Sequence, residues 1–90
     1  PFVNTHHILP ESIVNLLGEE GHNGEAVYEG LNDILQIENV FVHIYGKKNT
    51  KPGRKMGHIT ILSKEKQELL HQANRIRQTV KVKASQAVGI

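Results

Sequence analysis

The stretch HIYGKKNTKPGRKMGHITIL, residues 43–62, decides the fold because two apolar segments flank a short polar loop. The segment NVFVHIYGK (39–47) is rich in β-branched and aromatic residues, which is typical of a strand. The segment RKMGHITIL (54–62) predicts a second strand. Between them, KNTKPG (48–53) has the composition of a turn. We therefore expect an antiparallel hairpin.

The period of two residues along a strand divides the side chains of the first segment between two faces. One face carries Val40, Val42 and Ile44, and the other carries Phe41, His43 and Tyr45. Symmetric pairing about the loop sets Lys47 opposite Arg54 and His43 opposite His58. Like charges directly opposite each other destabilise a sheet unless water or a bound anion screens them.

Outside the hairpin, the sequence predicts one further strand, two helices and a polar tail. SIVNLLG (12–18) reads as a short strand after an extended lead-in, and Val27, Leu31, Ile34 and Leu35 form a helical stripe over 25–36. A second helix is expected over 64–79, with Ser63 as its N-cap. Its apolar stripe consists of Leu69, Leu70, Ala73, Ile76 and Val80. The tail, 81–90, is expected to be an edge strand or disordered.

Composition limits the class of protein. The 90 residues suit one α+β domain with a modest core, since 38% of them are hydrophobic. Cysteine is absent, the formal net charge is +2, and no run approaches the roughly 20 apolar residues of a membrane span. We expect a cytoplasmic protein without a membrane partner. Because the sequence begins at Pro1 without methionine, it is expected to be a fragment of a longer chain.

The positive charge of the loop has two interpretations. Four lysines and one arginine lie between residues 47 and 55, and exposed turns are commonly rich in lysine, so the loop is either a solvated tip or an anion site. Arginine offers a planar fork for phosphate oxygens and lysine adds a mobile point charge. Gly46, Gly53 and Gly57 would let a ligand approach the backbone closely.

Other chemistry is not indicated. The six histidines lack the spacing and the accompanying ligands of a zinc site, so we expect no metal site and interpret them as structural. No nucleotide-binding glycine loop, catalytic triad or paired carboxylate occurs, so no catalytic residue is predicted in this chain.

Three ordered motifs, Asn-Leu-Leu-Gly, His-x-Tyr-Gly-Lys and Arg-Lys-Met-Gly-His, give the chain a resemblance to a known family. Over about residues 10–78 it resembles the C-terminal domain of the 5-(carboxyamino)imidazole ribonucleotide synthetases, ATP-grasp enzymes of purine biosynthesis. Glycinamide ribonucleotide transformylases have a similar Tyr-Gly-Lys strand but typically lack the histidine found here as His58.

The resemblance implies a small antiparallel β-sandwich or barrel-like domain with two helices, the C-terminal domain type of ATP-grasp ligases. It implies ATP-dependent carboxylation of aminoimidazole ribonucleotide with bicarbonate, with ATP and Mg²⁺ bound mostly outside this segment. It also implies that Lys47 and Arg54 bind the ribonucleotide 5′-phosphate, with Lys55, Tyr45 and Gly53 as further ligand contacts. The isolated segment is expected to be inactive, and the full-length enzyme, with its N-terminal ATP-grasp domains, is expected to be a homodimer.

Two other functions fit the same hairpin. A small nucleic-acid-binding module would use the basic loop, but no aromatic residue is interleaved there for base stacking and the net charge is low. A structural or oligomerisation domain would use Phe41 or Val42 for contact. We expect no nucleic-acid partner.

Overall fold

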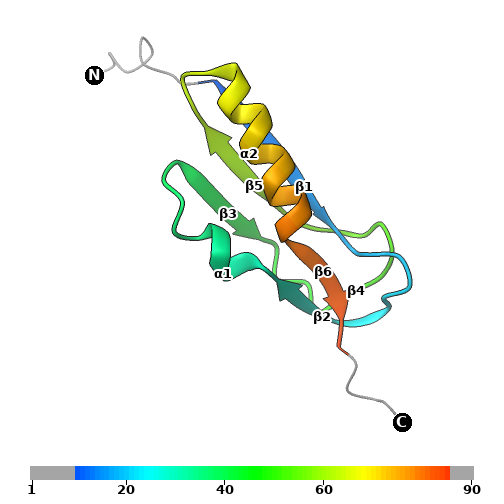
Figure 1. The fold of residues 1–90 in the computed structure, drawn as a ribbon. Helices are drawn as coiled ribbons and strands as arrows, with labels where there is room; N and C mark the ends of the chain where they lie inside the picture. Colours follow the sequence, from blue (N-terminus) through cyan, green and yellow to red (C-terminus); the bar gives the residue numbers. More distant parts are fainter. Residues whose placement is uncertain (1–9, 86–90) are drawn as a thin grey trace.

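Two three-stranded antiparallel sheets and two helices make up residues 10–85, the part of the chain that this computed structural model describes. Figure 1 shows one sheet with the strand order β1-β5-β3 and, at its lower end, a smaller sheet with the order β4-β2-β6. The predicted α+β class is confirmed. In chain order the elements are β1 (Glu11–Leu17), β2 (Gly24–Glu29), α1 (Leu31–Ile34), β3 (Val40–Ile44), β4 (Asn49–Thr50), β5 (Lys55–Leu62), α2 (Lys66–Thr79) and β6 (Lys81–Ala84).

The larger sheet has one buried face and one open face. Strand β5 is central, and its Ile59 pairs with Val14 of β1 and Val42 of β3 on the inner face. On the outer face, the predicted pair of His43 with His58 is confirmed. The three predicted strands of this sheet are therefore present, each within two or three residues of the expected bounds.

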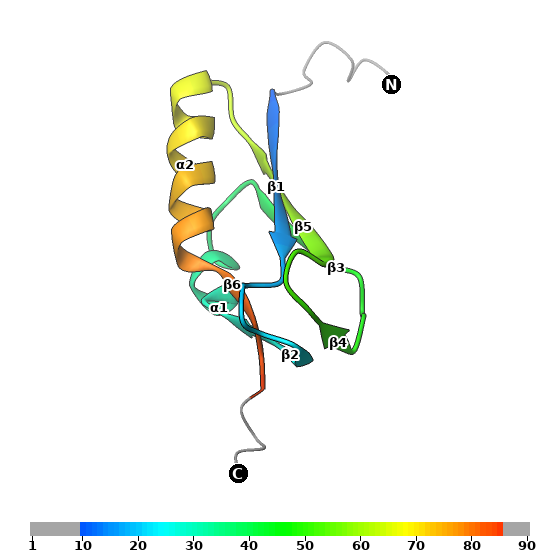
Figure 2. The same cartoon turned by 90° about the vertical axis from the view of Figure 1, so that its right-hand side faces the viewer.

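Helix α2 covers the inner face of this sheet and closes the core (Figure 2). Its buried residues are Leu69, Ala73 and Ile76, as the predicted stripe requires. The stripe is wrong at Leu70, whose side chain is 62% exposed. The core cluster consists of Val14, Leu16, Ile34, Val40, Met56, Ile59, Ile61, Leu69, Ala73, Ile76, Val80 and Val82.

The predicted helix over 25–36 is wrong. Gly24–Glu29 form strand β2, and only Leu31–Ile34 are helical. Gly30 separates the two elements with a φ of 78°, and a Cβ atom there would lie 2.0 Å from the carbonyl oxygen of Thr79. The chain must turn at this tight contact, so the helical stripe through Val27 is interrupted. Val27 is instead an exposed strand residue.

The loop between β3 and β5 is not the simple hairpin turn predicted over 48–53. Pairing between the strands continues as far as Tyr45, whose N–H donates to the carbonyl oxygen of Met56. The chain then crosses to the smaller sheet, where Asn49–Thr50 form β4 and pair with β2. Thr50 is 2% exposed. Burial of Thr50 and backbone hydrogen bonding to β2 therefore replace the predicted turn.

The start of α2 differs in detail from the sequence prediction, while its end at Thr79 agrees with it. The N-cap is Glu65 and not Ser63, whose Oγ accepts a hydrogen bond from the Glu65 N–H at 3.1 Å. After α2, Lys81–Ala84 form β6, which confirms the edge-strand alternative for the start of the tail. The predictions for residues 1–9 and 86–90 lie outside the described residues. Within 10–85, neither helix has the length and apolar character needed to cross a membrane.

Candidate functional site

The basic loop, residues 45–55, carries the cationic side chains that the sequence singled out. Lys47, Lys48, Lys51, Arg54 and Lys55 are all exposed. The loop leaves β3, contributes β4 to the smaller sheet and returns to β5, so both of its ends and its middle are held by backbone hydrogen bonds. A backbone fixed at three places limits the region that its charged side chains can reach, which lowers the ordering cost of binding an anion.

Gly18, the residue directly after β1, supports the tip of this loop. Its N–H donates to the carbonyl oxygen of Arg54 at 2.9 Å, and its carbonyl oxygen accepts from the Gly53 N–H at 2.9 Å. A Cβ atom on Gly18 would lie 2.1 Å from the carbonyl oxygen of Lys51. The Arg54 N–H closes the turn by donating to that same carbonyl at 3.0 Å. Only glycine allows this close approach, so Gly18 sets the position of Arg54.

Lys47 is held by the start of β5 and by an aromatic ring. Its ammonium donates to the carbonyl oxygen of Lys55 at 2.8 Å. The same nitrogen lies 5.8 Å from the centre of the Tyr45 ring, within the range of a cation–π interaction. One of its three donors is thus used, and two are available for an anion.

The ring beneath Lys47 is in turn held by two histidines. The Tyr45 hydroxyl and His58 Nδ1 share a hydrogen bond of 2.8 Å. His58 stacks on His43 across the strands, with ring centres 5.0 Å apart and 20° between the ring planes. Tyr45 is 38% exposed, so this cluster is part of the surface. A chain of contacts therefore runs from the outer face of the sheet to the ammonium of Lys47.

The predicted phosphate pair, Lys47 and Arg54, lies at the two ends of the loop but not as a cross-strand pair. The strands separate after Tyr45 and Met56, and Lys47 instead contacts the backbone of Lys55. The predicted repulsion between directly opposed cations is therefore wrong as a geometric argument. The exposure of both side chains leaves them accessible to an anion.

The three further contact candidates have different environments. The Lys55 side chain is exposed, and the backbone carbonyl oxygen of Lys55 accepts a hydrogen bond from the Lys47 ammonium. The hydroxyl of Tyr45 is engaged by His58, so its contribution is the ring. Gly53 has a φ of 78° with open space around it, as does Gly46 at 81°. Gly57 is the exception among the three glycines, because it is buried and a Cβ there would lie 2.4 Å from the His43 carbonyl oxygen.

Two supports of the loop are absent from the sequence prediction. The contact of Gly18 with the loop tip joins residues far apart in sequence, and no local pattern signals it. The contact of Tyr45 with His58 had a signal, because His58 lies diagonal to Tyr45 in the predicted register and aromatic side chains reach diagonal neighbours.

The remaining histidines and carboxylates do not gather around the loop. Among residues 10–85, no group of three or more His, Cys, Asp or Glu side chains is placed to hold a metal ion. His22 is used structurally, since its Nδ1 accepts the Ala84 N–H at 3.0 Å and ties the β1–β2 loop to β6.

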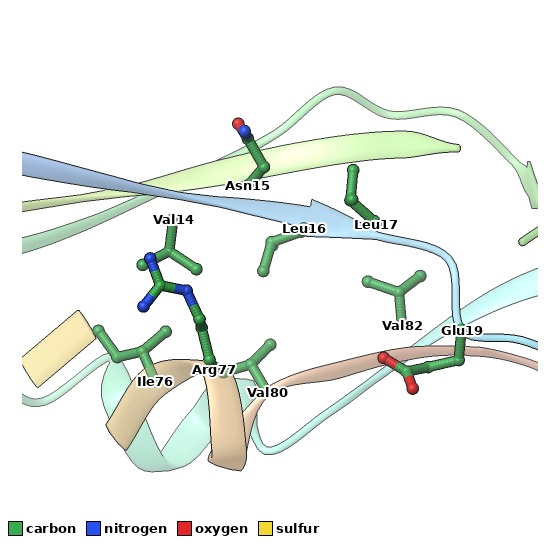
Figure 3. A pocket seen from close by; sticks show the side chains of 9 residues that line it. All are labelled: Val14, Asn15, Leu16, Leu17, Glu19, Ile76, Arg77, Val80 and Val82. Carbon is green, nitrogen blue, oxygen red and sulfur yellow. The ribbon is translucent and has the colours of Figure 1, made fainter. Parts of the chain in front are cut away.

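A pocket of about 170 Å³ lies elsewhere, between β1, the end of α2 and β6 (Figure 3). Apolar side chains from these elements line most of it, with Glu19 and Arg77 as its charged members. It contains neither Lys47 nor Arg54. Ligand pockets are usually about 300–1,000 Å³, so this volume suits a packing gap beside β1 rather than a nucleotide site.

Comparison with known proteins finds relatives with two different names. The chain is 33% identical over 78 residues to the N5-carboxyaminoimidazole ribonucleotide synthase of Aquifex aeolicus, covering 84% of this chain and 19% of that protein. It is 33% identical over 85 residues to a formate-dependent phosphoribosylglycinamide formyltransferase of Prochlorococcus marinus, covering 94% and 21%. The chain thus spans about a fifth of the length of these curated relatives.

A solved structure agrees with the sequence matches. The N5-carboxyaminoimidazole ribonucleotide synthetase of Thermotoga maritima superposes with a TM-score of 0.81 at 43% identity, over 86% of this chain and 21% of that one. These matches confirm the resemblance that the Tyr-Gly-Lys and Arg-Lys-Met-Gly-His motifs indicated. Residues 12–72 match the family model of the phosphoribosylaminoimidazole carboxylase C-terminal domain. The chain therefore belongs to this family.

Proposed function

We propose that the chain is the C-terminal domain of an ATP-grasp ligase that carboxylates aminoimidazole ribonucleotide with bicarbonate in purine biosynthesis. We further propose that its basic loop binds the ribonucleotide 5′-phosphate through Lys47 and Arg54. The observation that carries the second step is the position of the Lys47 ammonium. It is held by the Lys55 carbonyl oxygen and by the Tyr45 ring, and Lys55 directly follows Arg54 in the sequence.

The chemistry of the loop suits a phosphate monoester. The guanidinium of Arg54 offers two parallel N–H donors to two phosphate oxygens, and the Lys47 ammonium adds a point charge. A site of two cations, of which Lys47 is held by its neighbours, orients a substrate without taking part in bond formation. Both relatives described above carry a ribosyl phosphate in the printed name of their substrate or product, which supports a phosphate group as the shared ligand.

The remaining chemistry belongs, in this proposal, to other parts of the enzyme. ATP and Mg²⁺ would supply an activated carboxyl donor, and magnesium sites are built from carboxylate oxygens. The described residues 10–85 bring no three such ligands together, so we assign the ATP and magnesium sites to ATP-grasp domains outside these 90 residues. A homodimer of the full-length enzyme and a cytoplasmic location complete the proposal.

The experiment that tests the phosphate site uses the full-length enzyme. The variants Lys47→Met and Arg54→Gln should each raise KM for the ribonucleotide by about 10- to 100-fold with kcat little changed, because they remove charge-assisted hydrogen bonds to a non-reacting group. Lys48→Met is the matched control, since Lys48 is also an exposed residue of the same loop. Equal effects of all three variants would contradict a specific phosphate site.

A titration of the isolated chain separates this proposal from nucleic-acid binding. Aminoimidazole ribonucleotide should shift the amide signals of Lys47, Gly53, Arg54 and Lys55, while a short oligonucleotide should not. Shifts with the oligonucleotide alone, weakening steeply with salt, would instead indicate a nucleic-acid module.

A further inference from the structure

Three rings, those of His43, Tyr45 and His58, contact one another where β3 passes into the basic loop. The two histidine rings stack with centres 5.0 Å apart. The tyrosine ring meets both of them edge to face, with its centre 5.6 Å from that of His43 and 5.7 Å from that of His58. Aromatic pairs prefer these two arrangements at separations of about 4.5–7 Å. The three rings therefore restrict one another's orientation.

The Tyr45 ring depends on such support because the pairing of β3 with β5 ends at this residue. Its N–H donates to Met56, and the next residue, Gly46, has a φ of 81° and leads the chain away from the sheet. The side chain of Tyr45 is 38% exposed, so the core does not enclose it. His58 contacts it twice, by its ring and by the 2.8 Å hydrogen bond between Nδ1 and the hydroxyl.

Lys47 differs from other cations of the basic loop in how its head group is held. Its ammonium has two contacts, the Lys55 carbonyl oxygen and the Tyr45 ring. The side chains of Lys48 and Arg54 form no hydrogen bond or ion pair with the described residues. A free lysine side chain loses rotamer freedom when it binds an anion, and contacts made beforehand reduce that cost. The ring beneath Lys47 therefore favours binding before any anion arrives.

The chemistry of the two groups sets the direction of the hydrogen bond between Tyr45 and His58. A phenol gives up its proton more readily than a neutral imidazole N–H does, and an imidazole nitrogen is a far stronger base than a phenol oxygen. The hydroxyl therefore donates and Nδ1 accepts, which requires the histidine tautomer with its hydrogen on Nε2. A phenol that donates a hydrogen bond gains electron density in its ring, which strengthens the attraction of the ring for a cation.

We propose that His58 is a positioning residue for substrate binding. Its Nδ1 accepts a hydrogen bond from the Tyr45 hydroxyl and so holds and polarises the ring that places the Lys47 ammonium for the ribonucleotide phosphate. His43 supports this arrangement by stacking on the His58 ring. This inference rests on the proposed function and adds a residue that contacts neither the phosphate nor the reacting atoms. Because His58 acts through Lys47, its effect on binding should vanish when Lys47 is replaced.

Two amide variants of the full-length enzyme test the role of Nδ1. The oxygen and nitrogen of an asparagine amide are bonded to Cγ, as Nδ1 is, whereas a glutamine amide reaches the position of Nε2. His58→Asn should keep KM for the ribonucleotide within about two-fold of the parent, and His58→Gln should raise it about 3- to 10-fold with kcat little changed. His71→Leu, which removes an exposed histidine of α2, is the control and should change neither constant. Equal KM values for the two amide variants would overturn the inference.

A combination with Lys47→Met separates this inference from the proposed function. In the Lys47→Met enzyme, His58→Gln should raise KM no further, because the two residues act as one unit. An undiminished effect of His58→Gln in that background would show that His58 acts by another route and would overturn the inference. If Lys47→Met alone leaves KM unchanged, the phosphate site fails, and the positioning of Lys47 by His58 is decided separately by NMR.

NMR of the 90-residue chain measures the positioning without substrate. At about pH 8, where imidazole is ordinarily neutral, the nitrogen chemical shifts of His58 should show hydrogen on Nε2 and none on Nδ1. The ring-current shift of the Lys47 ε-methylene protons should persist in His58→Asn and decrease in His58→Gln. Hydrogen on Nδ1 would mean that Tyr45 accepts the bond, and equal ring-current shifts in the two variants would mean that His58 does not hold the ring. Either result would overturn the inference.

Discussion

The inner and outer faces of the β1-β5-β3 sheet are built from the same three strands but do different things. On the inner face, Ile59 and Ile61 are at most 1% exposed and pack beneath α2. On the outer face, Phe41 and Ile13 remain half exposed. The inner face therefore contributes the buried apolar contacts of this sheet, while the loop beside the outer face carries the proposed contact with substrate.

The largest expected difference between the faces is in stability. Ile59→Ala should lower the free energy of unfolding by about 2–4 kcal/mol, because it opens a cavity in a fully buried site. Phe41→Ala should lower it by less than about 1 kcal/mol, since that side chain is already largely solvated. Urea unfolding of the 90-residue chain measures both values. A loss at Phe41 as large as that at Ile59 would show that the outer face also stabilises the fold.

The next effect concerns the support of the loop by β1. Gly18→Ala should lower the free energy of unfolding by about 1–3 kcal/mol, because the new methyl group overlaps the Lys51 carbonyl. It should also shift the amide signals of Gly53 and Arg54, whose backbones are bonded to Gly18.

The control for this prediction is Gly21→Ala. Gly21 has a φ of 80° but nothing within 4 Å of a Cβ, so its replacement costs backbone strain alone. Its effect should leave the signals of Gly53 and Arg54 in place. Movement of these signals in both variants would mean that the loop responds to general destabilisation and not to Gly18.

Much of the larger sheet follows from the sequence, and most of the smaller one does not. Strands β3 and β5 are rich in β-branched residues, lie close together in the sequence and pair in the sheet. Local pattern and tertiary pairing therefore agree. Strand β2 has Ala26 and Tyr28 half buried and is completed by β6, more than fifty residues away. Its few apolar residues also fit a helical stripe, and only Gly30 marks the break.

The candidate site shows the same division. The residue types at Lys47 and Arg54 allow an anion site as one of two interpretations of the loop, since charge and turn glycines are local features. Their arrangement was not predictable, because β4 draws the middle of the loop into the smaller sheet through Thr50. The support from Gly18 likewise depends on how β1 meets the loop in space.

A smaller effect is expected at the buried hydroxyl of Tyr28, which belongs to the smaller sheet. No hydrogen-bond partner accompanies this hydroxyl within the described residues, and burial raises the pKa of Tyr28 above its ordinary value of 10.0. The unfolded chain then loses its tyrosine proton at a lower pH than the folded chain does. The contribution of Tyr28 to the free energy of unfolding is therefore unchanged below about pH 10 and falls as the pH rises further.

Tyr28→Phe tests this account. It removes an unsatisfied polar atom, so at neutral pH it should raise the free energy of unfolding by up to about 1 kcal/mol. It should also reduce the loss of stability above pH 10, measured by urea unfolding at pH 9 and pH 11. The chain has two tyrosines, so absorbance titration of the variant follows Tyr45 alone. If Tyr28→Phe loses as much stability between pH 9 and pH 11 as the parent chain does, another group causes that loss.

The smallest expected change in stability is at Tyr45, where the outer face meets the loop. Tyr45→Phe removes the hydrogen bond to His58 but keeps the ring beneath Lys47, so the free energy of unfolding should fall by about 0.5 kcal/mol. Tyr45→Leu removes the ring as well and should abolish the ring-current shift of the Lys47 ε-methylene protons in the NMR spectrum. Because the ammonium then keeps only the Lys55 carbonyl as its contact, this variant should bind the ribonucleotide phosphate more weakly than Tyr45→Phe does. Equal phosphate affinity in the two variants would show that the Lys55 carbonyl alone positions Lys47.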